Sequence, residues 1–183
     1  LYGAMKFVAG ESFIVNAESS NVRLSTAIYG NVLNSTGSII PLIWDSINKN
    51  YPLTLYSDKM TRFVIDVEDA MDLIEYGLEV SGYNVIPNLK SVLVKDLFEI
   101  YKEEFGLQYN IGVPRISEKL HEIMVSDEEA PRTLINPEGN TWYMHYKEIC
   151  ENSLEGEFSS RDVVISKDEL RQMLMGYNYF KND

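Results

Sequence analysis

Short segments rich in β-branched and aromatic residues alternate with longer amphipathic segments, and this order constrains the fold more than any other feature of the chain. The short segments end at turn residues, whereas the longer ones carry apolar residues at helical spacing. Strands are expected at 22–29, 53–56, 62–65, 83–86 and 109–111, and helices at 4–17, 39–47, 66–78 and 94–105. A last helix is expected after Ser166, which can form a capping box with Glu169. Strands and helices in alternation predict an α/β fold, although 131–161 gives no clear pattern.

The charge and the cysteine count limit the classes of partner. The 183 residues include 28 acidic and 16 basic ones, a formal net charge of −12 that repels nucleic acid and anionic membrane surfaces. Apolar runs are far shorter than a membrane span and no signal-peptide pattern is present, so a cytoplasmic location is expected. The single cysteine, Cys150, excludes an internal disulfide, and with only His121 and His145 beside it no metal site is expected.

Tyr2 and Lys6 are four residues apart, so on the expected helix both side chains point to one face. A tyrosine that accepts a proton near neutral pH needs its phenol pKa lowered from about 10, and a neighbouring ammonium does this by favouring the phenolate. The same spacing also arises by chance, so the pair alone does not decide between a catalytic and an incidental role.

Three further residues are candidates for contacts with a sugar or a phosphate. Asn31 follows a strand candidate and can donate to either group, although an ordinary turn explains it equally well. Ser38 precedes an apolar helix, where backbone amides can face a phosphate. Arg62 carries a guanidinium that matches phosphate oxygens bidentately, and a surface ion pair with Asp58 or Asp66 is the alternative.

Arg115 and Glu118 place a cation and a carboxylate about one helical turn apart. The pair suits a nucleoside diphosphate, because arginine binds phosphate and a carboxylate can accept from both ribose hydroxyls. An ion pair on a helix surface, worth a few tenths of a kcal/mol, is the alternative.

Taken in order, the motifs resemble one family. The matching stretches are Tyr2-Gly3-Ala4-Met5-Lys6, Tyr29-Gly30-Asn31-Val32-Leu33, Gly37-Ser38-Ile39-Ile40-Pro41, Met60-Thr61-Arg62-Phe63 and Glu118-Lys119-Leu120-His121-Glu122. The chain resembles the nucleotide-sugar branch of the extended short-chain dehydrogenase/reductases. Within that branch it is most similar to the inverting UDP-N-acetylglucosamine 4,6-dehydratases of polysaccharide and flagellin-glycan biosynthesis. An ordered match of five blocks is more specific than any one block.

The resemblance implies an enzyme that uses NAD or NADP and a UDP-sugar substrate. Tyr2 would take the proton of the sugar 4-hydroxyl while hydride passes from C4 to the cofactor, and Lys6 would hold the nicotinamide ribose. Water would then leave across C5 and C6 of the 4-keto sugar, and hydride would return to C6. Tyr29 and Asn31 are also implied as cofactor contacts. The implied substrate contacts are Asn31, Ser38, Thr54, Leu55, Arg62, Arg115 and Glu118. Of these, the two arginines and Asn31 would hold the diphosphate, Glu118 the ribose, and the 53–55 backbone the uracil.

The resemblance also implies the fold in more detail. The chain would hold the end of a Rossmann-type parallel-sheet NAD(P) domain plus a smaller mixed α/β substrate-binding domain. Residues 1–35 would belong to the cofactor domain, and 36–130 to the UDP-sugar-binding domain, with some segments returning to the cofactor domain. Residues 131–183 would form a C-terminal extension that ends in a helix.

Two departures from the family pattern are visible. Ile116-Ser117 stands where family members usually carry Pro-Gly, and neither the glycine-rich dinucleotide loop nor the acid–lysine pair of the elimination step is present. We therefore expect a C-terminal fragment that is inactive alone and that forms a homo-oligomer or associates with the missing N-terminal portion. A 4-epimerase or reductase of the same superfamily and a non-catalytic UDP-sugar-binding domain are the alternatives.

Overall fold

The structure is a computed structural model that describes residues 2–114, 116, 118–136 and 141–181, with side chains from Met5 onward. It divides the chain into two compact units. Unit 1 comprises Leu1–Tyr29, Glu68–Leu89 and Ile123–Phe158, and unit 2 comprises Gly30–Val67, Lys90–Glu122 and Ser159–Asp183. Helices and strands occur in both units, and three strand pairs are parallel, which confirms the α/β class.

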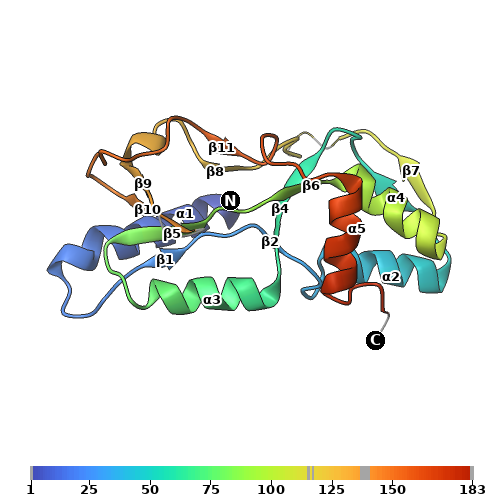
Figure 1. Ribbon diagram of the computed structural model, residues 1–183, viewed down its shortest axis with the longest axis horizontal. Helices are drawn as coiled ribbons and strands as arrows, with labels where there is room; N and C mark the ends of the chain where they lie inside the picture. The colour runs from blue at the N-terminus through green and yellow to red at the C-terminus, as the bar shows by residue number, and fades with distance from the viewer. Residues whose placement is uncertain (1, 115, 117, 137–140, 182–183) are drawn as a thin grey trace. The chain divides into compact units, whose positions relative to one another are not determined.

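Unit 1 is built on a four-stranded sheet in the order β1-β5-β10-β9 (Figure 1). The pairing of β1 with β5 is parallel, and β10 pairs antiparallel with both β5 and β9. The four strands are β1 (Thr26–Ala27), β5 (Tyr83–Pro87), β9 (Thr133–Ile135) and β10 (Thr141–His145). The other elements are α1 (Tyr2–Asn16), η1 (Ala17–Ser19), α3 (Val67–Gly77), β8 (Ile123–Val125), η2 (Ala130–Arg132) and β11 (Phe158–Ser159), the last of which pairs with β8. Ile14, Val85 and Ile86 are fully buried and form the centre of this unit.

Unit 2 contains two small sheets and three helices around one hydrophobic core. The strand β4 pairs parallel with β2 and antiparallel with β6, and β3 pairs parallel with β7. The strands are β2 (Asn31–Val32), β3 (Leu53–Leu55), β4 (Thr61–Ile65), β6 (Ser91–Leu93) and β7 (Tyr109–Ile111). The helices are α2 (Ile39–Lys49), α4 (Val94–Phe105) and α5 (Lys167–Gly176). Ile40, Ile43, Ile100, Tyr101 and Leu174 have no exposed surface and lie at the core's centre.

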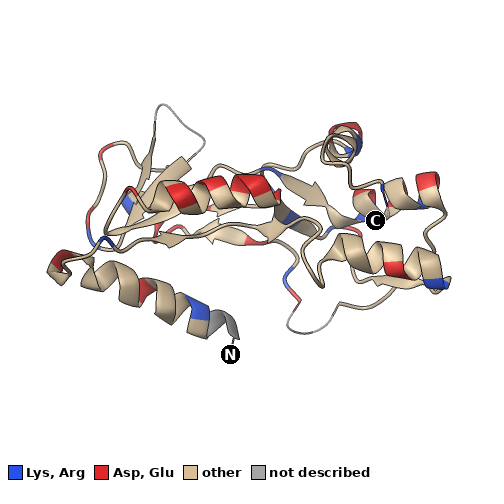
Figure 2. Cartoon of the chain, turned by 90° about the horizontal axis from the view of Figure 1, so that it is seen from below, with Lys and Arg blue, Asp and Glu red and all other residues tan. Residues whose placement is uncertain are grey.

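The residues expected to cap and end helices predicted the helix positions correctly. The helix α4 ends at Gly106, which adopts a left-handed φ of 74°, and α5 begins with the expected capping box. Ser166 N–H donates to Glu169 Oε2 at 2.9 Å, and the Glu169 N–H donates to Ser166 Oγ at 3.3 Å. Acidic side chains line α3, including Glu68 and Asp69 in its first turn, where the helix dipole favours them (Figure 2).

The strands were harder to place. The expected strand at 22–29 is wrong in length, because only Thr26–Ala27 forms regular ladder pairs. The Leu24 N–H donates instead to Ser81 Oγ at 3.0 Å, so a side chain replaces a neighbouring strand there. The poorly patterned segment 131–161 contains β9 and β10. The strand β10 pairs with β5, far earlier in the chain, and β9 pairs with β10.

Gly30 sits at a close approach of two backbone segments in unit 2. A Cβ at this position would lie 2.6 Å from the Phe63 Cβ and 2.8 Å from the Phe63 carbonyl carbon. Only glycine allows β2 to reach its register beside β4, where Asn31 is paired with Val64. The close approach at Gly30 therefore also fixes the position of the next residue, Asn31, at the start of β2.

We expect Gly30→Ala to lower the free energy of unfolding by about 1–3 kcal/mol, because the added methyl group meets backbone that cannot move aside. Gly176→Ala is the matched control, since a Cβ there meets nothing within 4 Å and alanine favours the helix by up to about 1 kcal/mol. Urea unfolding of the two variants measures the difference, and equal stability would contradict the close-approach explanation.

Candidate functional site

A cleft of about 610 Å³ opens in unit 2, between the start of α2, the strands β3 and β4, and the N-terminal half of α4. Most of its wall is apolar, with polar side chains entering at a few points. The cleft brings together six of the seven residues that the sequence suggested for substrate binding. They are Asn31, Ser38, Thr54, Leu55, Arg62 and Glu118. The seventh, Arg115, lies outside the described residues.

Arg62 is the cation of this cleft among the described residues that line it. Its side chain is 19% exposed and its two Nη atoms make four hydrogen bonds. Nη2 donates to Glu118 Oε1 at 3.0 Å and to the Lys119 carbonyl at 2.9 Å. Nη1 donates to the carbonyls of Thr61 at 2.7 Å and Leu120 at 3.4 Å. In place of the alternative ion pair with Asp58 or Asp66, Arg62 contacts residues 118–120.

Glu122 is a central residue that the sequence reasoning passed over. Its carboxylate accepts from Asn31 Nδ2 at 3.1 Å and from the Phe63 N–H at 2.9 Å, and it lies 3.8 Å from Arg62 Nε. Asn31 Nδ2 also donates to the Phe63 carbonyl at 3.0 Å. One carboxylate therefore fixes both the amide and the guanidinium that face the cleft. The sequence feature that could have pointed to Glu122 is its place in the Glu118–Glu122 block, one of the stretches that resemble the family.

Two hydrogen-bonded hydroxyls, those of Ser160 and Thr61, hold the segment around Glu122 in place. The Glu122 N–H donates to Ser160 Oγ at 2.9 Å, Ser160 Oγ lies 2.7 Å from Thr61 Oγ1, and Thr61 Oγ1 lies 2.8 Å from His121 Nδ1. Ser160 has no exposed surface. These contacts tie the backbone of Glu122 to β4 through two side-chain hydroxyls.

The start of α2 has the features of an anion site. Ser38 is the N-cap residue, with extended backbone at φ −76° and ψ 177°, but its side chain makes no capping hydrogen bond. Its Oγ is buried without a partner in the structure. The first N–H groups of a helix have no intrahelical acceptor, and the helix dipole favours negative charge at this end. The unpaired Ser38 hydroxyl is available to a ligand oxygen.

The opposite wall is formed by β3. Its backbone is held by the parallel partner β7, with Leu53 opposite Tyr109 and Leu55 opposite Ile111. Gly112 N–H extends the ladder to the Leu55 carbonyl at 2.9 Å. Thr54 and Leu55 thus present a straight edge of the cleft.

Lys6 and Tyr29 line a different hollow, which lies within unit 1. This groove of about 750 Å³ runs beside α1 and β1, and its wall includes Phe7, Phe13 and Ile74. The side chain of Tyr2, the expected catalytic base, lies outside the described residues. Asn31, expected beside the cofactor as well as the substrate, lines the unit 2 cleft instead of this groove.

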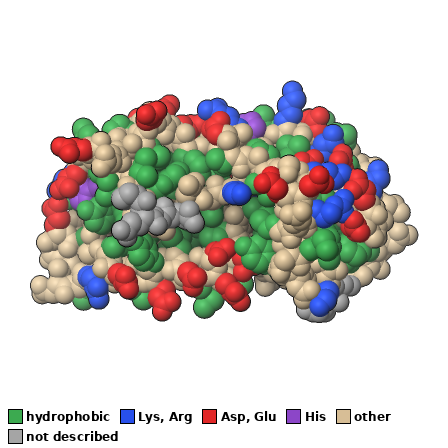
Figure 3. Space-filling model, viewed as in Figure 1, with side chains coloured by type: hydrophobic (Ala, Val, Ile, Leu, Met, Phe, Trp, Pro, Cys, Tyr) green, Lys and Arg blue, Asp and Glu red, His purple; other side chains and the backbone are tan. Residues whose placement is uncertain are grey.

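Unit 1 exposes an unusual amount of apolar surface along α1. Met5, Phe7, Val8 and Phe13 are each more than half exposed. Figure 3 shows the other face of unit 1, turned away from α1, where further hydrophobic side chains gather. The strand β1 is also an edge of its sheet. Surfaces of this kind are usually covered by further protein.

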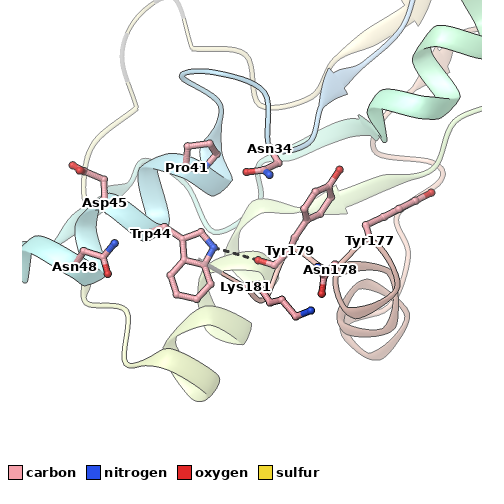
Figure 4. Close-up of a pocket in the computed structure, with 9 residues that line it drawn as sticks. All are labelled: Asn34, Pro41, Trp44, Asp45, Asn48, Tyr177, Asn178, Tyr179 and Lys181. Atoms are coloured by element: carbon pink, nitrogen blue, oxygen red, sulfur yellow. Dashed lines mark hydrogen bonds between the residues drawn. The ribbon is translucent and has the colours of Figure 1, made fainter. Parts of the chain in front are cut away.

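A second hollow of unit 2, of about 440 Å³, lies between α2 and the segment that follows α5 (Figure 4). Its shape comes from the turn at Asn178, which has a left-handed φ of 64°. After this turn, the Tyr179 carbonyl accepts hydrogen bonds from Trp44 Nε1 at 3.2 Å and from the Tyr101 hydroxyl at 2.8 Å. Burial raises the pKa of the Tyr101 hydroxyl, which stays a neutral donor.

The polar groups of this second hollow are engaged within the protein. Asp45 accepts from Lys49 Nζ at 2.7 Å and from the Tyr51 hydroxyl at 2.8 Å, and the Tyr179 hydroxyl donates to the buried Asp66. These contacts anchor the C-terminal segment to the core of unit 2. We therefore regard this hollow as structural.

Within the described ranges, no group of three or more histidine, cysteine, aspartate or glutamate residues is placed to hold a metal ion. Among the same residues, no helix has the length and apolar character needed to cross a membrane.

Comparison with known proteins identifies the family. The family model described as "Polysaccharide biosynthesis protein" matches residues 1–140. The chain belongs to this polysaccharide biosynthesis family. Its relatives include nucleotide-sugar dehydratases and epimerases, so the chain is a member of the extended short-chain dehydrogenase/reductase group that contains both.

Three curated relatives of this family member illustrate the range of names. An uncharacterised membrane protein of Methanocaldococcus jannaschii is 36% identical over 143 residues, which are 69% of this chain and 42% of the relative. The inverting UDP-N-acetylglucosamine 4,6-dehydratase of Campylobacter jejuni is 33% identical over 141 residues, or 73% of this chain and 41% of the enzyme. The UDP-glucose 4-epimerase of Rickettsia bellii is 36% identical over 129 residues, or 65% of this chain and 37% of the epimerase.

A solved structure supports the fold. The X-ray structure of Pen from Bacillus thuringiensis superimposes with a TM-score of 0.85, at 23% identity, over 97% of this chain and 58% of that one. The chain spans about two fifths of the length of the curated relatives that it matches.

We expect Glu122→Ala to lower the free energy of unfolding by about 1–3 kcal/mol, because the buried Phe63 N–H loses its acceptor and Asn31 loses one of two. Glu128→Ala, at an exposed position, should change stability by less than about 0.5 kcal/mol. Chemical unfolding of both variants provides the comparison. If the two variants match, Glu122 has no organising role.

Proposed function

We propose that the cleft of unit 2 binds a UDP-sugar and that the protein is an NAD(P)-dependent nucleotide-sugar 4,6-dehydratase of polysaccharide or glycan biosynthesis. The observation that carries the proposal is the convergence of Asn31, Ser38, Thr54, Leu55, Arg62 and Glu118 on one cleft. They come from four of the five stretches that match the family and from the 53–55 segment, which are spread over nearly ninety residues of sequence. The 33% identity with a 4,6-dehydratase over 73% of the chain supports the same reading.

The chemistry of the cleft suits a nucleoside diphosphate. Arg62 and the N-terminal end of α2, with the unpaired Ser38 hydroxyl, would hold the diphosphate. Glu118 would accept from the ribose hydroxyls, and the backbone edge of β3 would pair with the uracil. Asn31 would donate to a phosphate or sugar oxygen by releasing one of the two acceptors of its Nδ2, Glu122 or the Phe63 carbonyl.

The groove of unit 1 suits the cofactor part of the reaction. Lys6 and Tyr29 line it, and its mixed wall of an exposed ammonium and aromatic or aliphatic side chains fits a nicotinamide ribose and ring. Bound NAD(P) would accept the sugar's hydride and return it. The Lys6 ammonium would hold the ribose and lower the pKa of the Tyr2 phenol, which would take the proton of the sugar 4-hydroxyl.

A 4-epimerase is the second candidate, because relatives that carry this name are 36% identical to the chain. An epimerase returns the hydride to C4, whereas a dehydratase loses water and returns it to C6. Incubation of the full-length protein with UDP-N-acetylglucosamine and with UDP-glucose separates the two by product mass. A product lighter by one water supports the dehydratase, and an isomer of unchanged mass supports the epimerase.

The assignment of the cofactor and the UDP-sugar to different units is also a proposal. We assign cofactor binding to unit 1 and UDP-sugar binding to unit 2, and the boundaries at 35 and 130 remain predictions. We further propose that the apolar surface of α1 is covered by the rest of the cofactor domain or by a second copy of the protein. A cytoplasmic location remains a prediction.

Loss of Arg62 and loss of Tyr2 should have different kinetic effects in the full-length protein. Arg62→Ala removes a charge-assisted contact, so the Michaelis constant should rise about 10-fold to 100-fold with a smaller change in turnover. Tyr2→Phe should lower turnover by about 10²-fold to 10⁴-fold while UDP affinity is kept. Arg23→Ala, an arginine outside the cleft lining, serves as the control. Normal turnover of Tyr2→Phe, or normal UDP binding by Arg62→Ala, would show that the assigned roles are wrong.

The 183-residue chain alone should bind a hydrophobic dye and self-associate, because α1 carries exposed Phe7 and Phe13. Sedimentation velocity and dye fluorescence measure this directly. The double variant Phe7→Gln and Phe13→Gln should reduce both signals, whereas Ile149→Gln, an exposed apolar position that lines neither the groove nor the cleft, should reduce neither. A dye-negative monomeric wild-type chain would contradict the proposal that this surface needs a cover.

A further inference from the structure

Two groups that are assigned to different parts of the ligand are bonded to each other in the structure. Glu118 Oε1 accepts from Arg62 Nη2 at 3.0 Å, and both side chains line the cleft. The guanidinium is 19% exposed and the carboxylate 29% exposed, so neither is fully solvated. The other Nη hydrogen bonds of Arg62 go to backbone carbonyls.

The guanidinium therefore presents little net positive charge to an incoming phosphate. Glu118 is 3.0 Å away, and Glu122 lies 3.8 Å from Nε on another side. A phosphate that approaches Arg62 must displace one acceptor and is repelled by the carboxylate that it displaces. Such a site binds bare phosphates poorly unless the displaced carboxylate finds another partner.

The two carboxylates are not equally easy to displace. Glu122 is held by the Phe63 N–H at 2.9 Å and by the Asn31 amide at 3.1 Å. Glu118 lies in the irregular segment between β7 and β8, outside any helix or strand. We therefore expect Glu118 to move and Glu122 to stay.

We propose that the Arg62–Glu118 pair makes the cleft select nucleoside diphosphates over phosphates that lack a ribose. The inference rests on the proposed function and adds a selection step to it. A nucleoside diphosphate satisfies both partners when the pair opens: the diphosphate takes the place of Glu118 on Nη2, and the ribose hydroxyls take the place of Arg62 on Glu118. Inorganic pyrophosphate satisfies only the arginine and leaves a half-buried carboxylate without a partner.

The test is calorimetric titration of the full-length protein with inorganic pyrophosphate and, separately, with UDP. The variants are Glu118→Gln, Arg62→Gln, their combination, and Glu104→Gln as a control. Glu104, on α4, forms a surface ion pair with Arg171 of α5 and does not line the cleft. Its replacement by glutamine therefore changes the net charge by the same amount as Glu118→Gln, without touching the site.

In Glu118→Gln the arginine loses its counter-charge, so pyrophosphate should bind about fivefold tighter than to the wild type. UDP should bind at least about tenfold more weakly, because the ribose loses a charged acceptor. The gain for pyrophosphate should vanish in the double variant, since it depends on Arg62. Glu104→Gln should leave both affinities within about twofold.

The outcomes separate this inference from the proposed function. If wild-type protein binds UDP but Glu118→Gln binds pyrophosphate no tighter than wild type, the selection step is wrong and the UDP site stands. A gain of the same size in Glu104→Gln would also refute it, because net charge alone would then explain the effect. If the wild type does not bind UDP, the proposed function fails and this inference fails with it.

Discussion

The organisation of unit 2 depends on the Glu122 carboxylate more than on any other single group. It joins the amide of Asn31 on β2 to the backbone of Phe63 on β4, and it lies beside the Arg62 guanidinium. Its own backbone is fixed by Ser160, which donates its N–H to the Glu122 carbonyl at 2.8 Å. Three segments that are far apart in sequence are thereby held at one point. Because a partly buried charge is stabilised by pairing and hydrogen bonding, these contacts constrain the position of each partner.

This arrangement separates rigid from adjustable parts of the cleft. Asn31 and Glu122 are held by several contacts each, and at Gly30 β2 approaches β4 too closely for a Cβ. Glu118, in contrast, accepts a hydrogen bond from Arg62 and lies outside the helices and strands of the described residues. A rigid frame with one displaceable carboxylate allows the bound ligand to change the charge of the site without disturbing the fold.

Local signals were sufficient for the helices, whereas the set of residues that line the cleft followed from the family resemblance. The Ser166–Glu169 capping box and Gly106 mark helix ends that the structure confirms, because both act within a few residues of chain. The strands β9 and β10 could not be placed from sequence, since β10 is stabilised by β5, far earlier in the chain, and β9 pairs with β10. The length of β1 was wrong for a related reason: the Ser81 hydroxyl, 57 residues away, takes the place of a strand.

The role of Glu122 was missed because it is a property of three distant segments together. Nothing in the sequence near Glu122 indicates that its carboxylate will meet Asn31, and the pairing of Arg62 with Glu118 was equally invisible. The motifs identified residues that converge, but not which of them would bond to each other. Catalytic roles on α1 stay predictions, since the Tyr2 side chain is outside the described part of the chain.

The central claim is that the unit 2 cleft is a nucleoside diphosphate site, and hydrogen–deuterium exchange with and without UDP tests it most directly. Binding should slow exchange at the start of α2, around residues 37–40, and along 53–56 of β3, because these amides border the cleft from opposite sides. The amides of α5 beyond Leu170, which do not line the cleft, should be unchanged. Saturating UDP that protects neither segment, or that protects only unit 1, would contradict the account.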